Sequence, residues 1–163
     1  MAAPPRNAGA GVRVWTAGSD ELDAVAALLG GFRDFWGKRE PATDEMRTSA
    51  ERIQASGDGL YLLGAMDGRE PSGVAQLRFR WSVWTSAEDC WLEDLFVREE
   101  ARGSGLGRAL VEASLERARE RGCRRIELDV NEDNAAAVAL YEACGFELEP
   151  KGPGRTLFLG RRI

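Results

Sequence analysis

Apolar residues recur along this chain with two different periods, which together predict alternating strands and helices. Runs rich in valine, leucine and aromatic residues, typical of strands, occupy residues 12–15, 60–66, 73–79, 91–97 and 125–130. Apolar positions three and four residues apart predict helices that begin near residues 20, 43, 106 and 135. We expect Gly30-Gly31 to interrupt the first helix and residues 85–89 to form a polar loop.

The predicted order of elements is β-α-α-β-β-β-α-β-α-β-β, with closing strands at Phe146 and at Thr156–Gly160. Asp67-Gly68 is typical of a hairpin and makes the first half antiparallel, whereas residues 91–130 form a βαβ unit. We therefore predict one α/β domain over residues 12–163, with a mixed six- to seven-stranded sheet flanked by about four helices. Residues 1–11, mostly Ala, Pro and Gly, are expected to be a disordered tail.

Composition excludes several kinds of chemistry. The chain has no histidine, so Ser-His-Asp and Cys-His mechanisms and histidine-bearing metal sites are ruled out. Its three cysteines are widely spaced without a Cys-x-x-Cys pair, which argues against a disulfide framework or a zinc site, and we expect no metal. A net charge of −5 disfavours nucleic acid. Neither a membrane span nor a signal peptide is apparent, so we expect a cytoplasmic protein.

A glycine-rich turn stands between the strand at 91–97 and the helix that follows it. It reads Arg102-Gly103-Ser104-Gly105-Leu106-Gly107-Arg108. Free backbone N–H groups in such a turn point at an anion, glycines allow close approach, and the arginines add charge, so the turn predicts a pyrophosphate site. A Walker loop is excluded because Gly-Lys-Ser/Thr is absent, and a dinucleotide loop because Arg108 stands where the last glycine belongs. The alternative is a turn that only caps the helix.

The pattern Arg-x-x-Gly-x-Gly after a central strand resembles the coenzyme A pyrophosphate loop of the GNAT superfamily of N-acetyltransferases. Residues 131–147, NEDNAAAVALYEACGFE, are similar to that family's second motif. The resemblance implies acetyl-CoA as co-substrate. It assigns Asn134 to the pantetheine arm and Tyr141 to the role of general acid for the departing thiolate. It also assigns to coenzyme binding the main chain of Leu95, Phe96 and Val97 together with Arg102, Gly103, Ser104, Gly105, Leu106, Gly107 and Arg108.

Two adjacent carboxylates, Glu93 and Asp94, lie inside the otherwise apolar central strand. Alternation along a strand should point them to opposite faces, and carboxylates there are costly unless they are paired or used. One of them could bind an ammonium group and take its proton, and we assign that catalytic role to Glu93. The alternative is structural pairing with arginines. Phe32 and Trp36, at helical spacing, form either a core-facing helix end or a wall of the acceptor pocket.

The string Trp91 to Val97, WLEDLFV, is most similar to the diamine (spermidine/spermine-type) acetyltransferase branch of the family. In that branch the two carboxylates recognise the cationic amine, and Trp81 and Trp84 resemble an aromatic stretch of bacterial relatives. The resemblance implies transfer of acetyl from acetyl-CoA to a primary amine of a small cationic molecule, by direct attack in a ternary complex. Alternatives are a protein N-terminal or lysine acetyltransferase, or a non-catalytic acyl-CoA-binding domain. A homodimer is compatible with the resemblance.

Overall fold

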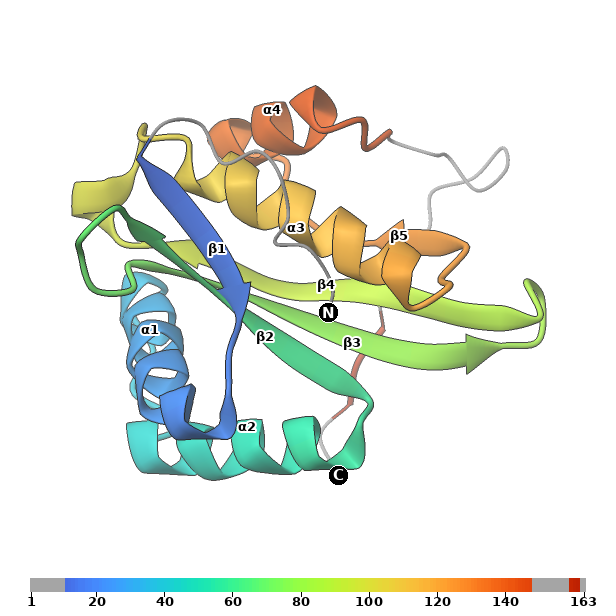
Figure 1. Ribbon diagram of the computed structural model, residues 1–163, viewed down its shortest axis with the longest axis horizontal. Helices are drawn as coiled ribbons and strands as arrows, with labels where there is room; N and C mark the ends of the chain where they lie inside the picture. The colour runs from blue at the N-terminus through green and yellow to red at the C-terminus, as the bar shows by residue number, and fades with distance from the viewer. Residues whose placement is uncertain (1–10, 148–158, 162–163) are drawn as a thin grey trace.

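A mixed sheet organises the part of the chain that the computed structural model describes, residues 11–147 and 159–161 (Figure 1). Its strands are β1 (Val12–Thr16), β2 (Gly59–Met66), β3 (Gly73–Ser82), β4 (Ala87–Val97) and β5 (Arg125–Glu127), and their spatial order is the order of the sequence. The first four strands are antiparallel, whereas β5 runs parallel to β4. The predicted α/β class is confirmed, with five strands in the described residues instead of six or seven. Phe146 follows the last helix outside any strand, and residues 156–158 lie outside the described residues.

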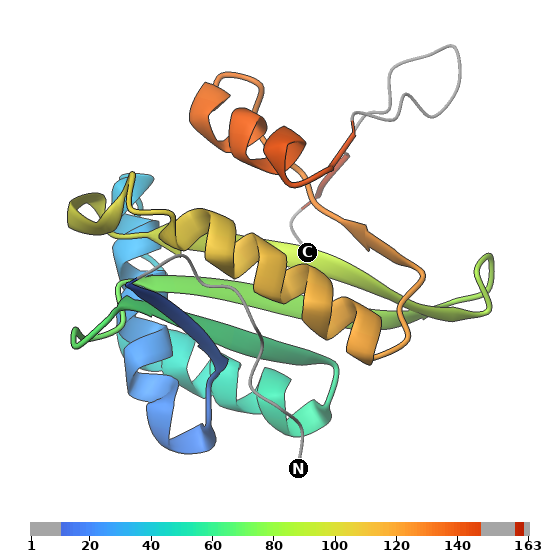
Figure 2. The same ribbon diagram turned by 45° about the horizontal axis from the view of Figure 1, so that its top comes forward.

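Helices cover both faces of the sheet. The views in Figures 1 and 2 place α1 (Leu22–Phe35) and α2 (Thr43–Ser56) on one face and α3 (Leu106–Glu120) on the other. The shorter α4 (Ala135–Ala143) contacts α3. Two 3-10 turns, Ser19–Glu21 and Glu99–Ala101, precede α1 and α3. This arrangement gives the predicted order of elements as far as α4. No helix in the described part of the chain has both the length and the apolar character that crossing a bilayer requires.

The sheet separates two apolar cores, as alternation along its strands requires. The α3 side buries Leu62, Leu77, Leu92, Leu106 and Leu110. The α1/α2 side buries Leu22, Val25, Tyr61, Leu63, Val74 and Phe96. Gly64 and Gly73 are partners across β2 and β3, and a Cβ on either would lie 2.7–2.8 Å from a leucine of α3. The two glycines therefore let α3 approach the sheet closely.

Gly30 and Gly31 do not interrupt the first helix, contrary to the sequence-based expectation, because α1 continues through both to Phe35. The glycines are needed for packing. A Cβ on Gly31 would lie 3.1 Å from Cε1 of Phe96 on β4, and one on Gly30 would lie 3.2 Å from Oγ1 of Thr43 on α2. Close contacts with the sheet and with α2 thus offset the low helix propensity of glycine.

Two strand boundaries also differ from the prediction. The expected loop at 85–89 was wrong over its second half, because β4 begins at Ala87. Asp89 is buried there, where its carboxylate accepts from Arg125 Nη2 at 2.6 Å and from Thr85 Oγ1 at 3.2 Å. The strand expected at 125–130 is only three residues long, from Arg125 to Glu127. Its early end shapes the candidate site.

Candidate active site

Strands β4 and β5 diverge after a short parallel pairing. Their parallel pairing joins only Asp89–Trp91 of β4 to Arg125–Glu127 of β5. From Leu92 to Val97, the outer edge of β4 has no neighbouring strand among the described residues. Backbone N–H and C=O groups on an unpaired edge are available to a ligand. The main chain of Leu95, Phe96 and Val97, predicted to bind the acyl arm, lies on this open edge.

The glycine-rich turn leads from the end of β4 into α3. Gly103 and Gly105 have φ of +73° and +88°, a conformation that other residues adopt with strain. Gly105 is the N-cap of α3, and the first turn of this helix has no side-chain cap in the described part of the chain. The Ser104 hydroxyl donates to the Ala101 carbonyl at 2.6 Å and accepts from the backbone N–H of Leu106 at 3.4 Å. In the first turn of α3, the N–H groups of Gly107 and Arg108 have no acceptor among the described residues, which suits an anion.

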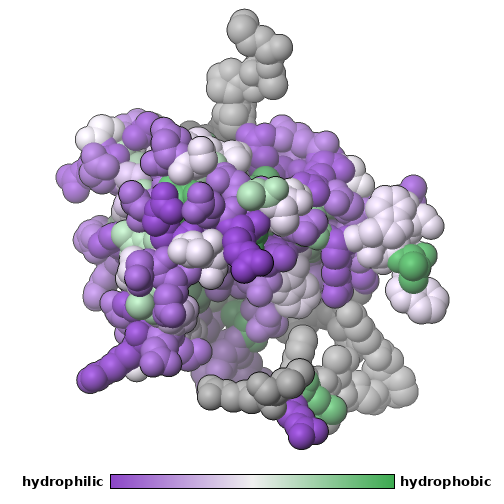
Figure 3. Space-filling model, turned by 90° about the horizontal axis from the view of Figure 1, so that it is seen from below, coloured by the Kyte–Doolittle hydropathy of each residue, from purple (hydrophilic) through white to green (hydrophobic). Residues whose placement is uncertain are grey.

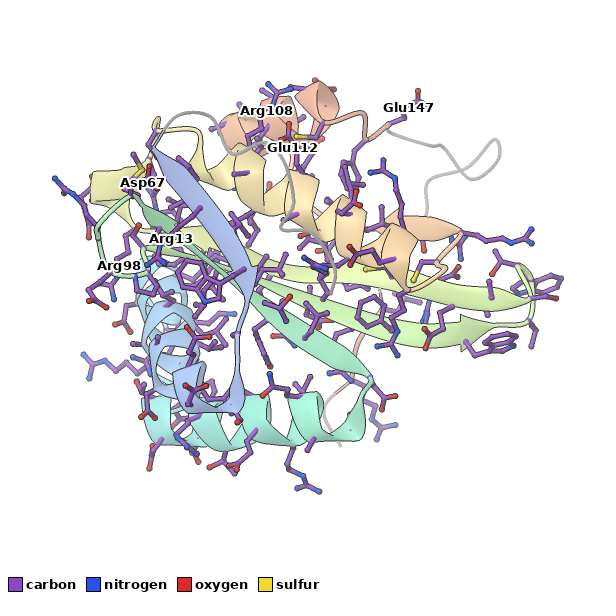
Figure 4. The ribbon with its side chains drawn as sticks, in the orientation of Figure 1. Arg13, Asp67, Arg98, Arg108, Glu112 and Glu147 are labelled. Atoms are coloured by element: carbon purple, nitrogen blue, oxygen red, sulfur yellow. The ribbon has the colours of Figure 1, made fainter. Side chains whose placement is uncertain are left out.

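The two arginines of the turn are both held by protein contacts. Arg102 lies over the ring of Phe35, 4.9 Å from its centroid, and its Nε donates to the Val97 carbonyl at 3.1 Å. Arg108 points toward α4, where it donates to the Ala143 carbonyl at 3.2 Å. It also pairs with Glu112 one turn along α3, as Figure 4 shows. Arg102 therefore stays beside the open edge of β4, whereas Arg108 links α3 to α4.

The second sequence motif forms helix α4. Asn134 is its N-cap, and its side-chain oxygen accepts from the backbone N–H of Ala137 at 3.3 Å. Tyr141 is half-buried beside the α3-side core, with its ring edge-to-face with Phe146 at 5.7 Å. Burial raises the pKa of Tyr141 to about 12, and the nearby Asp129 carboxylate and Cys144 thiol act in the same direction. The Tyr141 phenol is therefore protonated at neutral pH and able to donate a proton.

A β-bulge separates the two carboxylates of β4. Gln76 is paired with Asp94, but the next residue of β3, Leu77, is paired with Leu92, so Glu93 has no partner in the ladder. The bulge reverses the alternation: Leu92 and Leu95 both face α3, whereas Asp94 faces α1 and α2 with Phe96. The regular alternation along β4 is therefore interrupted at Glu93. Asp94 turns toward the helices and Glu93 is exposed at the bulge.

A pocket of about 470 Å³ opens between α1, α2 and the sheet. Phe32 and Trp36 form its aromatic wall, Leu29, Met46 and Ile53 contribute apolar surface, and Tyr61, Gln76 and Asp94 form its floor. The Phe32 ring stacks on Phe96 at 5.5 Å, which ties this wall to β4. Phe32 and Trp36 therefore line the same pocket as the Asp94 carboxylate. Glu93 does not line the pocket.

The electrostatics of the pocket floor single out Asp94. Burial, with the nearby charges of Glu93 and Asp129, raises the pKa of Asp94 to about 6. A carboxyl group with such a pKa is ionised at neutral pH yet basic enough to accept a proton. Asp129 follows the short β5 and also raises the pKa of Tyr141, so its charge lies near both groups.

Three residues of the site, Tyr61, Gln76 and Asp129, do not stand out in the sequence. Tyr61 and Gln76 occupy core-facing positions of β2 and β3, where an apolar residue is the ordinary expectation. A buried Gln in an apolar strand was the only available signal. Asp129 was hidden inside a longer predicted strand.

The structure does not bring Trp81 and Trp84 to the pocket. They lie at the β3–β4 hairpin, 68% and 92% exposed, where a pale and green group protrudes at the right of Figure 3. Trp81 is five residues along β3 from Gln76, roughly 16 Å at about 3.3 Å per residue. The described residues contain no group of three or more His, Cys, Asp or Glu placed to hold a metal ion.

The model of the Acetyltransferase (GNAT) family matches residues 26–146 of this chain. Thialysine N-epsilon-acetyltransferase of Caenorhabditis elegans is 33% identical over 137 residues, which cover 83% of this chain and 82% of that protein. Mycothiol acetyltransferase of Nocardiopsis dassonvillei is 34% identical over 146 residues, which cover 84% of this chain and 42% of that protein. This chain thus matches less than half the length of the mycothiol enzyme.

A solved structure shares the fold over nearly the whole chain. It is a crystal structure of a protein from Arthrobacter sp. FB24 that is itself proposed to be an acetyltransferase. The two superpose with a TM-score of 0.81 and 32% identity, over 96% of this chain and 99% of that one.

Proposed function

Because this chain belongs to the acetyltransferase (GNAT) family, we propose that it transfers an acetyl group from acetyl-CoA to the primary amine of a small cationic molecule. One observation supports this above all: the open edge of β4 and the aromatic pocket flank the same short segment, Asp94–Val97. A thioester bound along the edge and an amine bound in the pocket would then meet at β4. Direct attack in a ternary complex needs this proximity.

The residues of the coenzyme side fit a pantetheine arm that ends in a pyrophosphate. The main-chain groups of Leu95, Phe96 and Val97 that face the open edge of β4 hydrogen-bond the arm in the manner of an added strand. The turn from Gly103 to Gly107 and the uncapped start of α3 hold the pyrophosphate through backbone N–H groups. Arg102 adds positive charge at the same end. Asn134, which caps α4, contributes an amide toward the arm.

On the acceptor side, Asp94 binds the ammonium group of the substrate and takes its proton, directly or through water. We assign this role to Asp94 instead of Glu93 because Asp94 lines the pocket and its pKa is raised to about 6. Glu93 contributes a like charge that keeps Asp94 basic. The neutral amine then attacks the thioester carbonyl, so that a C–N bond forms and the C–S bond breaks.

Tyr141 supplies the proton that the departing thiolate needs. Its phenol stays protonated to high pH, with a pKa of about 12, so the hydroxyl is available to hydrogen-bond the thiolate as it develops. Because a thiol has a pKa of about 8.5, full transfer of the proton to the thiolate is uphill, and the resulting phenolate regains a proton from water. The names of the relatives support an amine acceptor, since the thialysine enzyme acts at an ε-nitrogen. The net charge of −5 favours cationic acceptors.

The proposal is tested by following free thiol while the protein is incubated with acetyl-CoA and a panel of amines. The panel contains polyamines, free amino acids, aminoglycosides and lysine-containing peptides. We expect thiol release with one or more small amines at a rate above that of any peptide. Faster turnover of peptides would favour a protein acetyltransferase. Tight binding of acetyl-CoA without acetylation of any amine would favour a non-catalytic acyl-CoA-binding domain.

A further inference from the structure

Arg78 is a cation on the sheet floor that the proposed reaction does not use. It lies two residues beyond Gln76 on β3 and faces the same side, toward α2. No hydrogen bond or ion pair joins its guanidinium to another residue within 11–147 or 159–161, and its Nε is closed off from solvent without an acceptor. Arg117 also has an unsatisfied Nε, but it pairs with Glu120 through Nη1. A part-buried arginine without a counter-charge is costly unless an anion completes it.

The stem of Arg78 is held beside the pocket by its neighbours. Gly59 is its register partner on β2, and a Cβ at Gly59 would lie 3.0 Å from Cδ of Arg78 and 2.6 Å from Cγ2 of Ile53. Ile53 lines the pocket. The missing side chain at position 59 thus lets the arginine stem lie against β2 next to a pocket wall.

Two buried polar side chains, Tyr61 and Gln76, lie near Arg78 and Asp94 on the same face of the sheet. Tyr61, Gln76 and Asp94 are register partners that form one row across β2, β3 and β4, all on the pocket side. Tyr61 is 1% exposed and Gln76 7% exposed, and neither side chain is hydrogen-bonded within the described part of the chain. Burial raises the pKa of Tyr61 to about 12, while the charge of Arg78 acts to lower it and that of Asp94 to raise it, so both charges act on that phenol. This face of the sheet therefore carries a negative charge at Asp94, which lines the pocket, and a positive charge at Arg78, which lies beside the pocket on β3.

The separation of the two charges limits the length of a ligand that could reach both. Arg78 and Asp94 are one strand and two residues apart, which places their Cα atoms about 8 Å from each other. An extended chain of about six covalent bonds spans a similar distance. A molecule with an amine at one end and an anionic group at the other could therefore contact both residues along the polar floor.

We propose that the acceptor is an ω-amino acid or a compound of similar span, with its amine at Asp94 and its carboxylate at Arg78. This inference rests on the proposed function and narrows its substrate class. A carboxylate accepts two parallel N–H bonds from a guanidinium, and such charge-assisted pairs are strong and geometrically specific. Gln76 and Tyr61 would bond polar groups carried between the two ends.

The test compares 6-aminohexanoate with 6-aminohexanamide, which differ in the charge of one end and share chain length and reactive amine. Asp94 and the net charge of −5 alone would favour the amide, because it is the more cationic of the two. We expect the wild-type kcat/KM, measured by thiol release, to be about tenfold or more higher for the acid, mostly through a lower KM. Arg78→Met should abolish that preference while leaving turnover of the amide within about twofold.

Two further variants separate binding from folding. Arg78→Lys should retain part of the preference for the acid. Arg80→Met removes an equal charge from an exposed position on the same face of β3 and should keep the wild-type ratio. Equal or better turnover of the amide by the wild type, or an unchanged ratio in Arg78→Met, would overturn the inference. Turnover of diamines alone would overturn it while sustaining the proposed function, and no thiol release with any amine would overturn both.

Discussion

Gln76 on β3 lies directly opposite Asp94 on β4, and the ladder between the two strands slips by one residue immediately beyond this pair. The slip leaves Glu93 as the extra residue of a bulge. As a result, two carboxylates adjacent in sequence have different surroundings, with Asp94 in the pocket and Glu93 exposed. Equal changes of charge at the two positions should therefore have unequal effects.

Asp94→Asn should lower kcat/KM for the amine by about 10²- to 10⁴-fold, because it removes the group that takes the proton. Glu93→Gln should cost less than about tenfold. It should also move the acid limb of the pH profile to lower pH, since the Glu93 charge helps to raise the pKa of Asp94 to about 6. Profiles of kcat/KM against pH check both statements. A larger loss in Glu93→Gln than in Asp94→Asn would return the catalytic role to Glu93.

The same pKa makes a prediction about stability. The pKa of Asp94 is raised from 3.8 to about 6, so the folded chain binds this proton more tightly than the unfolded chain. That contribution to stability is complete below about pH 4 and is lost as the pH rises through about 6. Asn is neutral throughout and loses nothing. Asp94→Asn should therefore exceed the wild type in free energy of unfolding by up to about 3 kcal/mol at pH 8, and by little near pH 4.

Urea denaturation of both proteins at the two pH values measures this difference. Glu93→Gln serves as control, because it removes one charge from an exposed position and should change stability by less than about 0.5 kcal/mol. A destabilised Asp94→Asn at pH 8 would show that the Asp94 charge has a stabilising partner in the folded protein.

The parts of the site that follow from local sequence were predictable. The turn from Arg102 to Gly107 is contiguous, and Gly103 and Gly105 have the positive φ that a close approach requires. Asn134 and Tyr141 stand seven residues apart at the start and in the last turn of one helix, as their spacing indicates. In each case the position depends on neighbours in the chain.

The remaining features depend on contacts between distant segments. The bulge at Glu93 cannot be recognised in the sequence, because β4 is apolar on both faces and its hydrophobic pattern therefore does not fix its register with β3. Gly31 looks like a helix break until Phe96 is placed 3.1 Å from its missing Cβ. The gap between β4 and β5 arises where β5 stops at Glu127, and hydrophobic periodicity continues beyond that residue.

Tyr141→Phe should reduce kcat by about 10²-fold or more while the affinity for acetyl-CoA stays within about twofold. The ring keeps its edge-to-face packing on Phe146, so only the hydroxyl is lost. Steady-state kinetics and calorimetric titration with acetyl-CoA measure the two quantities, and Phe146→Leu controls for loss of packing. A kcat equal to that of the wild type would assign the proton transfer to another group, such as water.

The last prediction separates the coenzyme role of the glycine turn from its backbone strain. Gly105 and Gly122 flank α3, have φ of +88° and +80°, and a Cβ added to either would meet no other atom within 4 Å. Leucine at either position should therefore lower stability by a similar amount, about 1–2 kcal/mol, from the left-handed conformation alone. Only Gly105→Leu places a side chain where we propose that the pyrophosphate binds, so it should weaken binding of coenzyme A at least tenfold while Gly122→Leu leaves binding unchanged. Thermal unfolding and calorimetric titration of both variants provide the comparison, and equal affinities would move the pyrophosphate site away from this turn.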